Sequence, residues 1–352
     1  MEKIAPALLD WFYRNRRSLP FRDDPTPYHI WVSEIMLQQT RVAAALPYYE
    51  RFIRELPDIP ALAACPPERL DKLWEGLGYY RRVHSMQKAA QQVCRQYGGH
   101  LPASYDALLA LPGIGPYTAG AIASIGFGLA APAVDGNVLR VFARLYNDSG
   151  PITDPAVKKR FTQRVMEHQP PDAPGDYNQA LMELGALVCL PGGAPLCAQC
   201  PLAALCEGRK AGAAEALPCK AAPKPRRVLP VTVALVQNAA TGEWLLQKRP
   251  EGGLLAGLWQ PPAFEGQQLD GPAVRQALSA LGLDPGGSGE PAPLPAAKHI
   301  FTHVEWRMSG WQLTVPDQPA PGGCVWAGRD GLEGRYALPG AFKAYRKFLL
   351  EA

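Results

Sequence analysis

Apolar residues recur at intervals of three and four over most of the first 190 positions of the chain. This spacing is typical of helices that pack on a core. It predicts an opening helix over 5–13 and a helix within 28–42, where Pro27 suits a first helical position. Further helices are expected at 43–56, 58–64, 67–76, 80–97, 104–110, 116–127, 134–146, 155–168 and 176–188. The first part of the chain is therefore expected to be a helical domain with short connections.

The pattern changes after residues 207–228, which are rich in Ala, Pro and basic side chains. That composition is typical of a linker. Beyond it, alternating apolar positions predict strands at 231–236 and 244–248, joined as a hairpin, and more strand over 298–314. Helices are expected at 272–282 and 338–350, so the second domain is predicted to be α+β.

Composition adds two constraints. The 352 residues suggest two domains, and no apolar run approaches the roughly 18 residues of a membrane span. The start of the chain lacks a signal-peptide pattern, so an intracellular protein is expected. Residues 1–228 hold 26 Lys or Arg against 21 Asp or Glu. This excess fits phosphate contact but is weak evidence for nucleic-acid binding.

Glu34 is the first candidate for chemistry, because its neighbours within 28–42 are mostly bulky and uncharged. Desolvation raises the pKa of a carboxyl group, so Glu34 could hold a proton near neutral pH and act as a general acid. A solvated glutamate on a helix face is the structural alternative. The basic run at 14–17 is interpreted as a helix cap or solvated face rather than a phosphate contact.

Two later stretches carry further candidates for function, one for phosphate binding and one for a second catalytic carboxyl group. Residues 111–115 form a Leu-Pro-Gly-Ile-Gly turn before a helix that begins at Pro116, where bare backbone amides can face a phosphate. Asp135 precedes a helical stretch and is expected to cap it as an anion. A protonated and an ionised carboxyl group together are suited to cleavage at an anomeric carbon.

Four cysteines fall within 18 residues, as Cys189-x7-Cys197-x2-Cys200-x5-Cys206. Such clustering indicates a metal centre in a reducing compartment. The spacing does not choose between zinc and an iron–sulfur cluster.

Taken together, these motifs resemble the adenine DNA glycosylases of the mismatch-repair MutY type. The resemblance rests on residues 31–40, the Gly-Leu-Gly-Tyr-Tyr run at 76–80, the turn at 111–115, Val-Asp-Gly-Asn-Val at 134–138 and the four cysteines. It implies an all-α helix-hairpin-helix core (about 22–132), an iron–sulfur subdomain from 1–21 and 133–208, a linker at 209–228 and an α+β Nudix-like lesion-recognition domain at 229–352. It also implies a [4Fe–4S] cluster held by the four cysteines.

The same resemblance implies roles for single residues. Glu34 would protonate adenine flipped out of a pair with 8-oxoguanine or G, and Asp135 would stabilise the oxocarbenium ion. Tyr117 and Asn137 match positions beside the reacting groups. The residues expected to contact DNA are Leu37, Gln39, Thr40, Arg41, Tyr79, Gly113, Gly115, Phe301, Thr302 and His303.

Three departures from the family pattern bear on function. The first cysteine gap holds seven residues rather than six, so its loop is expected to bulge. Helix 271–281 lacks the glutamates of Nudix pyrophosphatases, so nucleotide hydrolysis is not expected. Thr302 stands where Ser is more common in the family, which keeps the hydroxyl and adds a methyl group.

Tyr117 separates this chain from its nearest alternative, an endonuclease III-like pyrimidine glycosylase/lyase. That branch carries a lysine at this position, whose amine forms a Schiff base and cleaves the strand. The chain is therefore expected to be a monofunctional glycosylase without an efficient lyase step. We expect it to act on duplex DNA as a monomer in the bacterial cytoplasm. The remaining alternative is a non-catalytic DNA-binding protein or a nucleotide-sanitising protein whose second domain turns over oxidised nucleotides.

Overall fold

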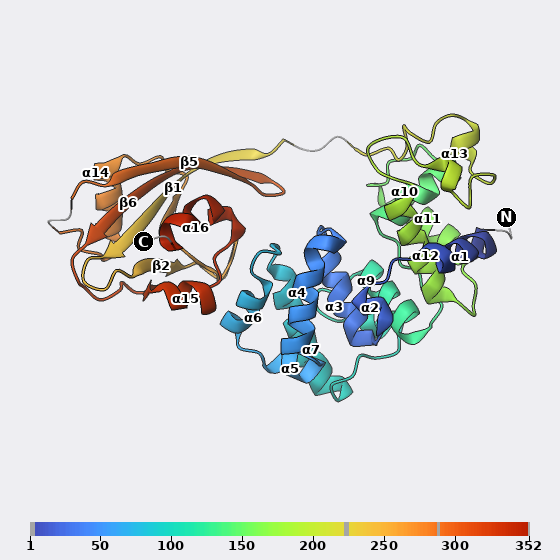
Figure 1. The fold of residues 1–352 in the computed structure, drawn as a ribbon, viewed down its shortest axis with the longest axis horizontal. Coiled ribbons are helices and arrows are strands. Elements are labelled where there is room, and N and C mark those ends of the chain that lie inside the picture. The colour runs from blue at the N-terminus through green and yellow to red at the C-terminus, as the bar shows by residue number, and fades with distance from the viewer. Residues whose placement is uncertain (1–3, 222–224, 287–288, 351–352) are drawn as a thin grey trace. The chain divides into compact units, whose positions relative to one another are not determined.

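The computed structural model of the chain describes residues 4–221, 225–286 and 289–350. The chain divides into two compact units. Unit 1 comprises Met1–Ala64 and His84–Ala222, and unit 2 comprises Cys65–Val83 and Pro223–Ala352. Figure 1 follows both units along the chain by colour.

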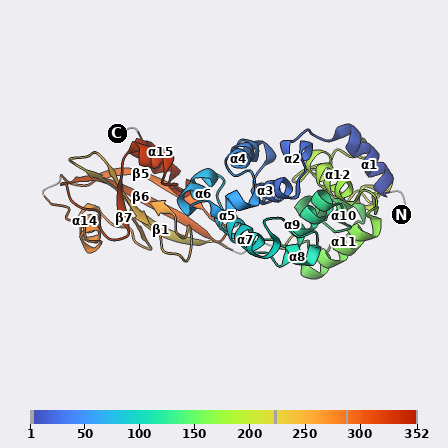
Figure 2. The ribbon, with the colours of Figure 1, turned by 90° about the horizontal axis from the view of Figure 1, so that it is seen from below.

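The regular elements of unit 1 are helices. They are α1 (Ile4–Asn15), α2 (Pro20–Asp23), α3 (Pro27–Leu37), α4 (Val42–Glu55), α5 (Ile59–Ala64), most of α7 (Arg81–Tyr97), α8 (Tyr105–Leu109), α9 (Pro116–Ala121), the π-helical turn η1 (Ile122–Gly126), α10 (Gly136–Leu145), α11 (Pro155–His168), α12 (Pro174–Leu187), the 3-10 turn η2 (Cys197–Gln199) and α13 (Glu207–Lys210). The predicted helical region is confirmed, and α3 lies beside α9 in Figure 2.

Helices of unit 1 begin where the sequence signals them. The Thr26 side chain accepts from the His29 amide at 3.2 Å and Pro27 follows, while Asp135 accepts from the Val138 amide at 2.8 Å. Their ends differ from the prediction. Helix α3 stops at Leu37 rather than continuing to 42, because Gln39 takes a left-handed backbone conformation with φ of 59°. The helix expected over 116–127 relaxes into a π turn after Ala121.

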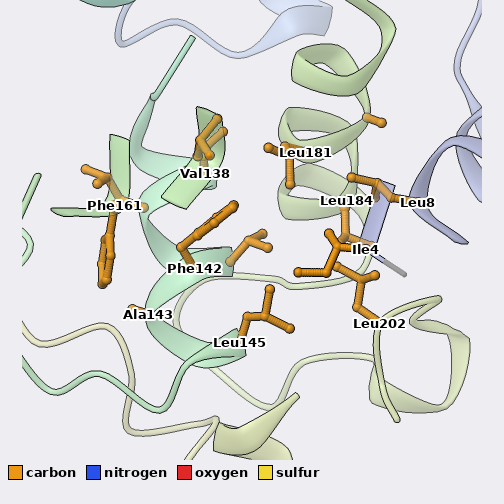
Figure 3. Close-up of a cluster of buried hydrophobic side chains, with 14 of the residues drawn as sticks. Ile4, Leu8, Val138, Phe142, Ala143, Leu145, Phe161, Leu181, Leu184 and Leu202 are labelled. Atoms are coloured by element: carbon orange, nitrogen blue, oxygen red, sulfur yellow. The ribbon is translucent and has the colours of Figure 1, made fainter. Parts of the chain in front are cut away.

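One buried cluster of unit 1 lies between α1, α10 and α12. Figure 3 shows Leu8 of α1 close to Leu184 of α12, with Phe142 of α10 across the cluster from them, and the same cluster includes Val138 and Leu202. Helices α10 and α12 approach closely at Gly185, where a Cβ atom would lie 2.5 Å from that of Asn137. Only glycine fits there, and its absence of a side chain sets the position of the residues that follow Asp135.

Unit 2 is a mixed sheet with helices on both faces. Its elements are α6 (Pro67–Trp74), β1 (Arg227–Asn238), β2 (Trp244–Lys248), β3 (Trp259–Gln260), β4 (Ala263–Glu265), α14 (Gly271–Ala280), β5 (Ala292–Ile300), β6 (Val304–Val315), β7 (Cys324–Ala327), α15 (Arg329–Gly334), the 3-10 turn η3 (Gly340–Phe342) and α16 (Lys343–Leu350). The strand order is β3-β2-β1-β6-β5, with β4 paired to β1 and β7 to β2. Strands β1 and β6 are parallel, and the other pairs are antiparallel.

Alternation along β1 directs side chains to opposite faces of this sheet. Val233 and Leu235 pack with Tyr345 of α16, whereas Val236 packs with Val274 of α14. Helices α14 and α16 accordingly flank the sheet in Figure 1. The predicted strand region over 298–314 is two strands, β5 and β6, joined by residues 301–303.

Two segments differ from the expected domain limits. Residues 65–83 group with the C-terminal part, because Lys72 Nζ donates to the Leu332 carbonyl at 2.9 Å and the Leu338 amide donates to Glu75 at 3.0 Å. Part of the predicted linker is packed on unit 1, since Ala214 and Leu217 are buried. Residues 222–224 of that linker lie outside the described ranges. No helix in residues 4–221, 225–286 or 289–350 is long and apolar enough to cross a membrane.

Candidate active site and cysteine centre

A cleft of about 1120 Å³ in unit 1 contains the predicted catalytic residues. It is lined by Glu34 of α3, Tyr117 of α9, and Asp135 and Asn137 at the start of α10. Glu34 precedes Tyr117 by 83 residues and Asp135 by about a hundred, and the fold brings them to one surface. The sequence predicted the four residues, and the structure brings them together.

Glu34 has the environment expected of a general acid. Its residue exposure is 7%, and the Tyr117 hydroxyl donates a hydrogen bond to its Oε2 atom. Burial raises the pKa of Glu34 to about 7, opposed by the Tyr117 hydrogen bond and assisted by the nearby charge of Asp135. The carboxyl group is therefore close to half protonated at neutral pH.

Asp135 is held by donors from its own helix. Its Oδ1 accepts from the Val138 amide at 2.8 Å, and its Oδ2 accepts from the Asn137 side chain at 2.7 Å. Burial raises the pKa of Asp135, and these hydrogen bonds and the guanidinium of Arg140 oppose the rise. Each of the opposing interactions favours the anion.

Arg140, for which the sequence predicted no role, fixes Asn137. One guanidinium nitrogen donates to Asn137 Oδ1 and to the Gly185 carbonyl, each at 2.8 Å, and Nε donates to the Cys189 carbonyl at 2.7 Å. Arg140 therefore joins the Asp135 side of the cleft to the segment that begins the cysteine cluster. The available signal was an arginine among the apolar residues of a predicted helix, 138–142.

The basic run at 14–17 was misinterpreted in part. Arg17 lines the cleft with Arg22, and both donate to the buried carboxylate of Glu183, at 2.7 Å and 2.9 Å. Burial alone would raise the pKa of Glu183, but these donors outweigh it and bring the pKa to about 2. The pairing spans about 160 residues, so no local pattern could indicate it.

Five of the six DNA-contact candidates of unit 1 line the same cleft. Leu37 at the end of α3 lines it together with Gln39 and Thr40, which follow the helix, and Gln39 is exposed. Gly113 and Gly115 line it from the turn before α9, where Gly113 has φ of 76°. Arg41 is exposed and is not among the lining residues.

The remaining DNA-contact candidates belong to unit 2. Tyr79 is 50% exposed with φ of 49°, a strained conformation for a tyrosine. Arg82 steadies its turn by donating to the carbonyls of Leu77 at 3.2 Å and Gly78 at 3.1 Å. These two hydrogen bonds hold the turn that presents the Tyr79 ring to solvent.

The predicted lesion-reading residues form the turn between β5 and β6. Phe301 packs edge-on against Trp306 with ring centroids 4.9 Å apart, whereas Thr302 and His303 are exposed. The Phe301 amide donates to the Val304 carbonyl at 2.8 Å and closes the turn. The turn is anchored by the packed ring of Phe301, and it presents the Thr302 hydroxyl and the His303 imidazole to solvent.

The four clustered cysteines line one cavity. The seven-residue first gap is accommodated by a loop closed at its base, where the Leu196 amide donates to the Val188 carbonyl at 2.9 Å. Arg144 donates to Cys189 Sγ at 3.3 Å. Within the described ranges no three Cys, His, Asp or Glu side chains are placed to hold a single metal ion.

Comparison with known proteins agrees with these features. Residues 32–167 match the HhH-GPD superfamily base excision DNA repair protein family, and residues 232–347 match the NUDIX domain family. A solved thermostable thymine-DNA glycosylase is 26% identical, with a TM-score of 0.54, over 60% of this chain and 97% of that one.

Curated relatives match over a larger part of the chain. The adenine DNA glycosylase of Homo sapiens is 34% identical over 91% of this chain and 69% of its own length. The adenine DNA glycosylase of Mus musculus is 35% identical over 91% of this chain and 72% of its own length.

The helical core and the paired carboxyl groups in its cleft define a DNA N-glycosylase of the helix-hairpin-helix superfamily. Within that class, the Nudix-like second domain distinguishes this chain from the shorter thymine-DNA glycosylase. The chain belongs to the adenine DNA glycosylase family.

Proposed function

We propose that the chain is a monofunctional base-excision repair glycosylase that removes adenine paired with 8-oxoguanine or G in duplex DNA. The observation that carries this proposal is the Tyr117–Glu34 hydrogen bond in a cleft shared with Asp135. The pKa of Glu34 near 7 supplies a proton donor at neutral pH, and the donors around Asp135 favour a nearby anion.

The reaction follows from this division. The adenine nucleotide enters the cleft, and Glu34 gives its proton to a ring nitrogen of the base. The bond between the base and the sugar breaks, and its electron pair leaves with adenine. The carboxylate of Asp135 stabilises the positive charge on the sugar until water adds to the anomeric carbon and releases a proton. Asn137 and Arg140 hold the geometry of Asp135.

The remaining candidates extend this proposal. Tyr79, Gln39 and Leu37 would fill the space left in the duplex, and Thr40 and Arg41 would support the opened strand. Amides of the turn at Gly113 and Gly115 would take a backbone phosphate. The exposed side chains of Thr302 and His303, beside Phe301, would read the lesion base. The cytoplasmic setting and the monomeric state stay predictions.

Cys189, Cys197, Cys200 and Cys206 would hold a [4Fe–4S] cluster. When bound, such a cluster supplies a rigid cross-link between segments that have little regular structure. Arg144 supports this role, because it contacts Cys189 and also donates to the Leu190 and Leu217 carbonyls at 2.9 Å. Visible absorbance with iron by elemental analysis tests the assignment.

The decisive experiment measures base release from duplexes with A opposite 8-oxoguanine, G, C or T. Wild type should release adenine from the duplexes with A opposite 8-oxoguanine or G. Glu34→Gln should lower the rate by about 10²–10⁴-fold, which is the rate enhancement that a general acid typically provides. Glu167→Gln, an exposed glutamate outside the cleft, is the matched control and should keep the wild-type rate. Equal rates for Glu34→Gln and wild type would refute the mechanism.

The same duplexes distinguish the lyase alternative. An enzyme with Tyr117 in place of a lysine should leave an abasic site, so strand breaks should appear only after alkali treatment. A strong borohydride-trapped adduct between enzyme and DNA would contradict the assignment of a monofunctional enzyme.

A further inference from the structure

Helix α11 carries four cations that fall into two groups. Arg160 pairs with Asp148 at 2.6 Å, and the Arg164 guanidinium stacks 3.9 Å above a tyrosine ring. Lys158 and Lys159 are exposed, and neither ammonium group has a hydrogen bond or ion pair among the described residues. The helix therefore uses its arginines within the fold and leaves its two adjacent lysines available.

The available lysines face the same cleft as the catalytic carboxyl groups. Leu139, one turn along α10 from Asp135, shares a buried cluster with Ile152, which lies just before α11. Both of these apolar residues also line the cleft. The packing places Lys158 and Lys159 on the Asp135 side, with Thr153 and Thr162 hydroxyls lining the cleft beside them.

The other two cations that line this cleft are already engaged. Arg17 and Arg22 are both paired with Glu183, whose side chain is 1% exposed. Their guanidinium groups share this one carboxylate, so they keep one net positive charge between them and are held by an internal partner before any ligand arrives. A polyanion that enters the cleft meets uncompensated positive charge at Lys158 and Lys159.

We propose that Lys158 and Lys159 bind the phosphodiester groups that flank the nucleotide entering the cleft. This inference rests on the proposed function, because an extruded nucleotide brings its own backbone phosphates to the mouth of the site. The lysines act as point charges and read no base, so their effect is the same for every sequence. They support binding and do not touch the reacting atoms.

Salt dependence of DNA binding tests the proposal on the full chain. The probe is a duplex with A opposite G, bound by proteins that all carry Glu34→Gln so that the adenine stays attached, and the variant adds Lys158→Gln with Lys159→Gln. Loss of two phosphate contacts should lower the slope of log K against log salt by about 2. The wild-type advantage in affinity should then shrink roughly tenfold between 50 and 200 mM salt.

Two controls separate this effect from a change in net charge or folding. Lys88→Gln with Lys343→Gln removes the same charge from exposed positions outside the cleft and should leave the slope near wild type. Lys158→Arg with Lys159→Arg should restore the slope. An equal loss of slope in the Lys88 and Lys343 control, or no loss in the cleft variant, would overturn the proposal.

Neutral phosphates locate the contact. Methylphosphonates placed one at a time around the target adenine should weaken binding by wild type at the flanking positions and have little effect on the double glutamine variant. The same effect in both proteins would place the contact elsewhere. Absence of adenine release by wild type would refute the proposed function instead, whereas normal release with an unchanged salt slope would refute only the role of the lysines.

Discussion

Two glutamates line the cleft of unit 1, and both are almost inaccessible to water, yet their pKa values are shifted in opposite directions. Glu34 is 7% exposed with a pKa of about 7, and Glu183 is 1% exposed with a pKa of about 2. Glu34 has a phenol as its hydrogen-bond donor, whereas Glu183 has the guanidinium groups of Arg17 and Arg22. Burial raises the pKa of both carboxyl groups, and only the cationic partners of Glu183 are strong enough to reverse the rise.

Because their pKa values are shifted in opposite directions, Glu183 and Glu34 have opposite effects on stability at neutral pH. The pKa of Glu183 is lower in the folded chain, so its contribution is present above pH 4.5 and is lost as pH falls through about 2. The pKa of Glu34 is higher in the folded chain, so its contribution is present below pH 4.5 and is lost as pH rises through about 7. At neutral pH the ionised Glu183 stabilises the folded chain, whereas ionisation of Glu34 destabilises it.

Glu183→Gln should produce the largest effect. It leaves two cations facing a neutral amide, and breaking a buried pair costs roughly 3–5 kcal/mol of unfolding free energy at pH 7. Urea unfolding measures the loss, and amide hydrogen exchange of α12 assigns it to unit 1. Glu167→Gln, on the exposed face of α11, should stay within about 0.5 kcal/mol of wild type. A similar small change for Glu183→Gln would show that the ion pairs add nothing.

Glu34→Gln should have the opposite sign. The amide removes a carboxyl group that is costly to ionise, so the variant should be more stable than wild type by up to roughly 3 kcal/mol at pH 8. The gain should vanish below about pH 4.5, where the wild-type carboxyl group is protonated in both folded and unfolded chains. Unfolding curves at pH 4.5 and pH 8 measure it. A gain that does not depend on pH would mean that desolvation of Glu34 is not its cause.

The sequence predicted one of these glutamates and could not predict the other. Glu34 sits among bulky neighbours within a few positions, and Asp135 precedes a helix that begins at Gly136, so both signals are local. Pro27 and Pro116, which mark the first positions of α3 and α9, are also local signals. Glu183 depends on Arg17 and Arg22, which are more than 150 residues away and meet it only after folding.

Helix ends show the same limit. No glycine or proline marks the end of α3 at Leu37, and the left-handed conformation of Gln39 follows from tertiary context. Residues 65–83 likewise join unit 2 through Lys72 and Glu75, whose partners lie about 260 positions later. Cys189 could be predicted as a ligand from spacing, but its contact with Arg144 could not.

The pH dependence of base release tests the charge assigned to Glu34 directly. The acid form is needed, so kcat/KM should be level below about pH 7 and should fall tenfold per pH unit above it. Glu183 stays ionised throughout this range because its pKa is about 2. Single-turnover rates between pH 5.5 and 9 give the profile. A rate that rises through pH 7 would require Glu34 to act as a base.

Tyr117→Phe should have the smallest effect and sharpen the comparison most. The phenol donates to the Glu34 carboxylate and lowers the pKa of that group, so its removal should move the alkaline limb of the rate profile to higher pH. The plateau rate should fall only modestly if the phenol tunes Glu34 without taking part in proton transfer. Tyr105→Phe is the matched control, because this tyrosine also lines the cleft and no hydrogen bond joins it to Glu34 in the described residues. A limb that moves to lower pH would mean that Tyr117 stabilises the neutral acid, and that Glu34 owes its high pKa to its partner as much as Glu183 owes its low one.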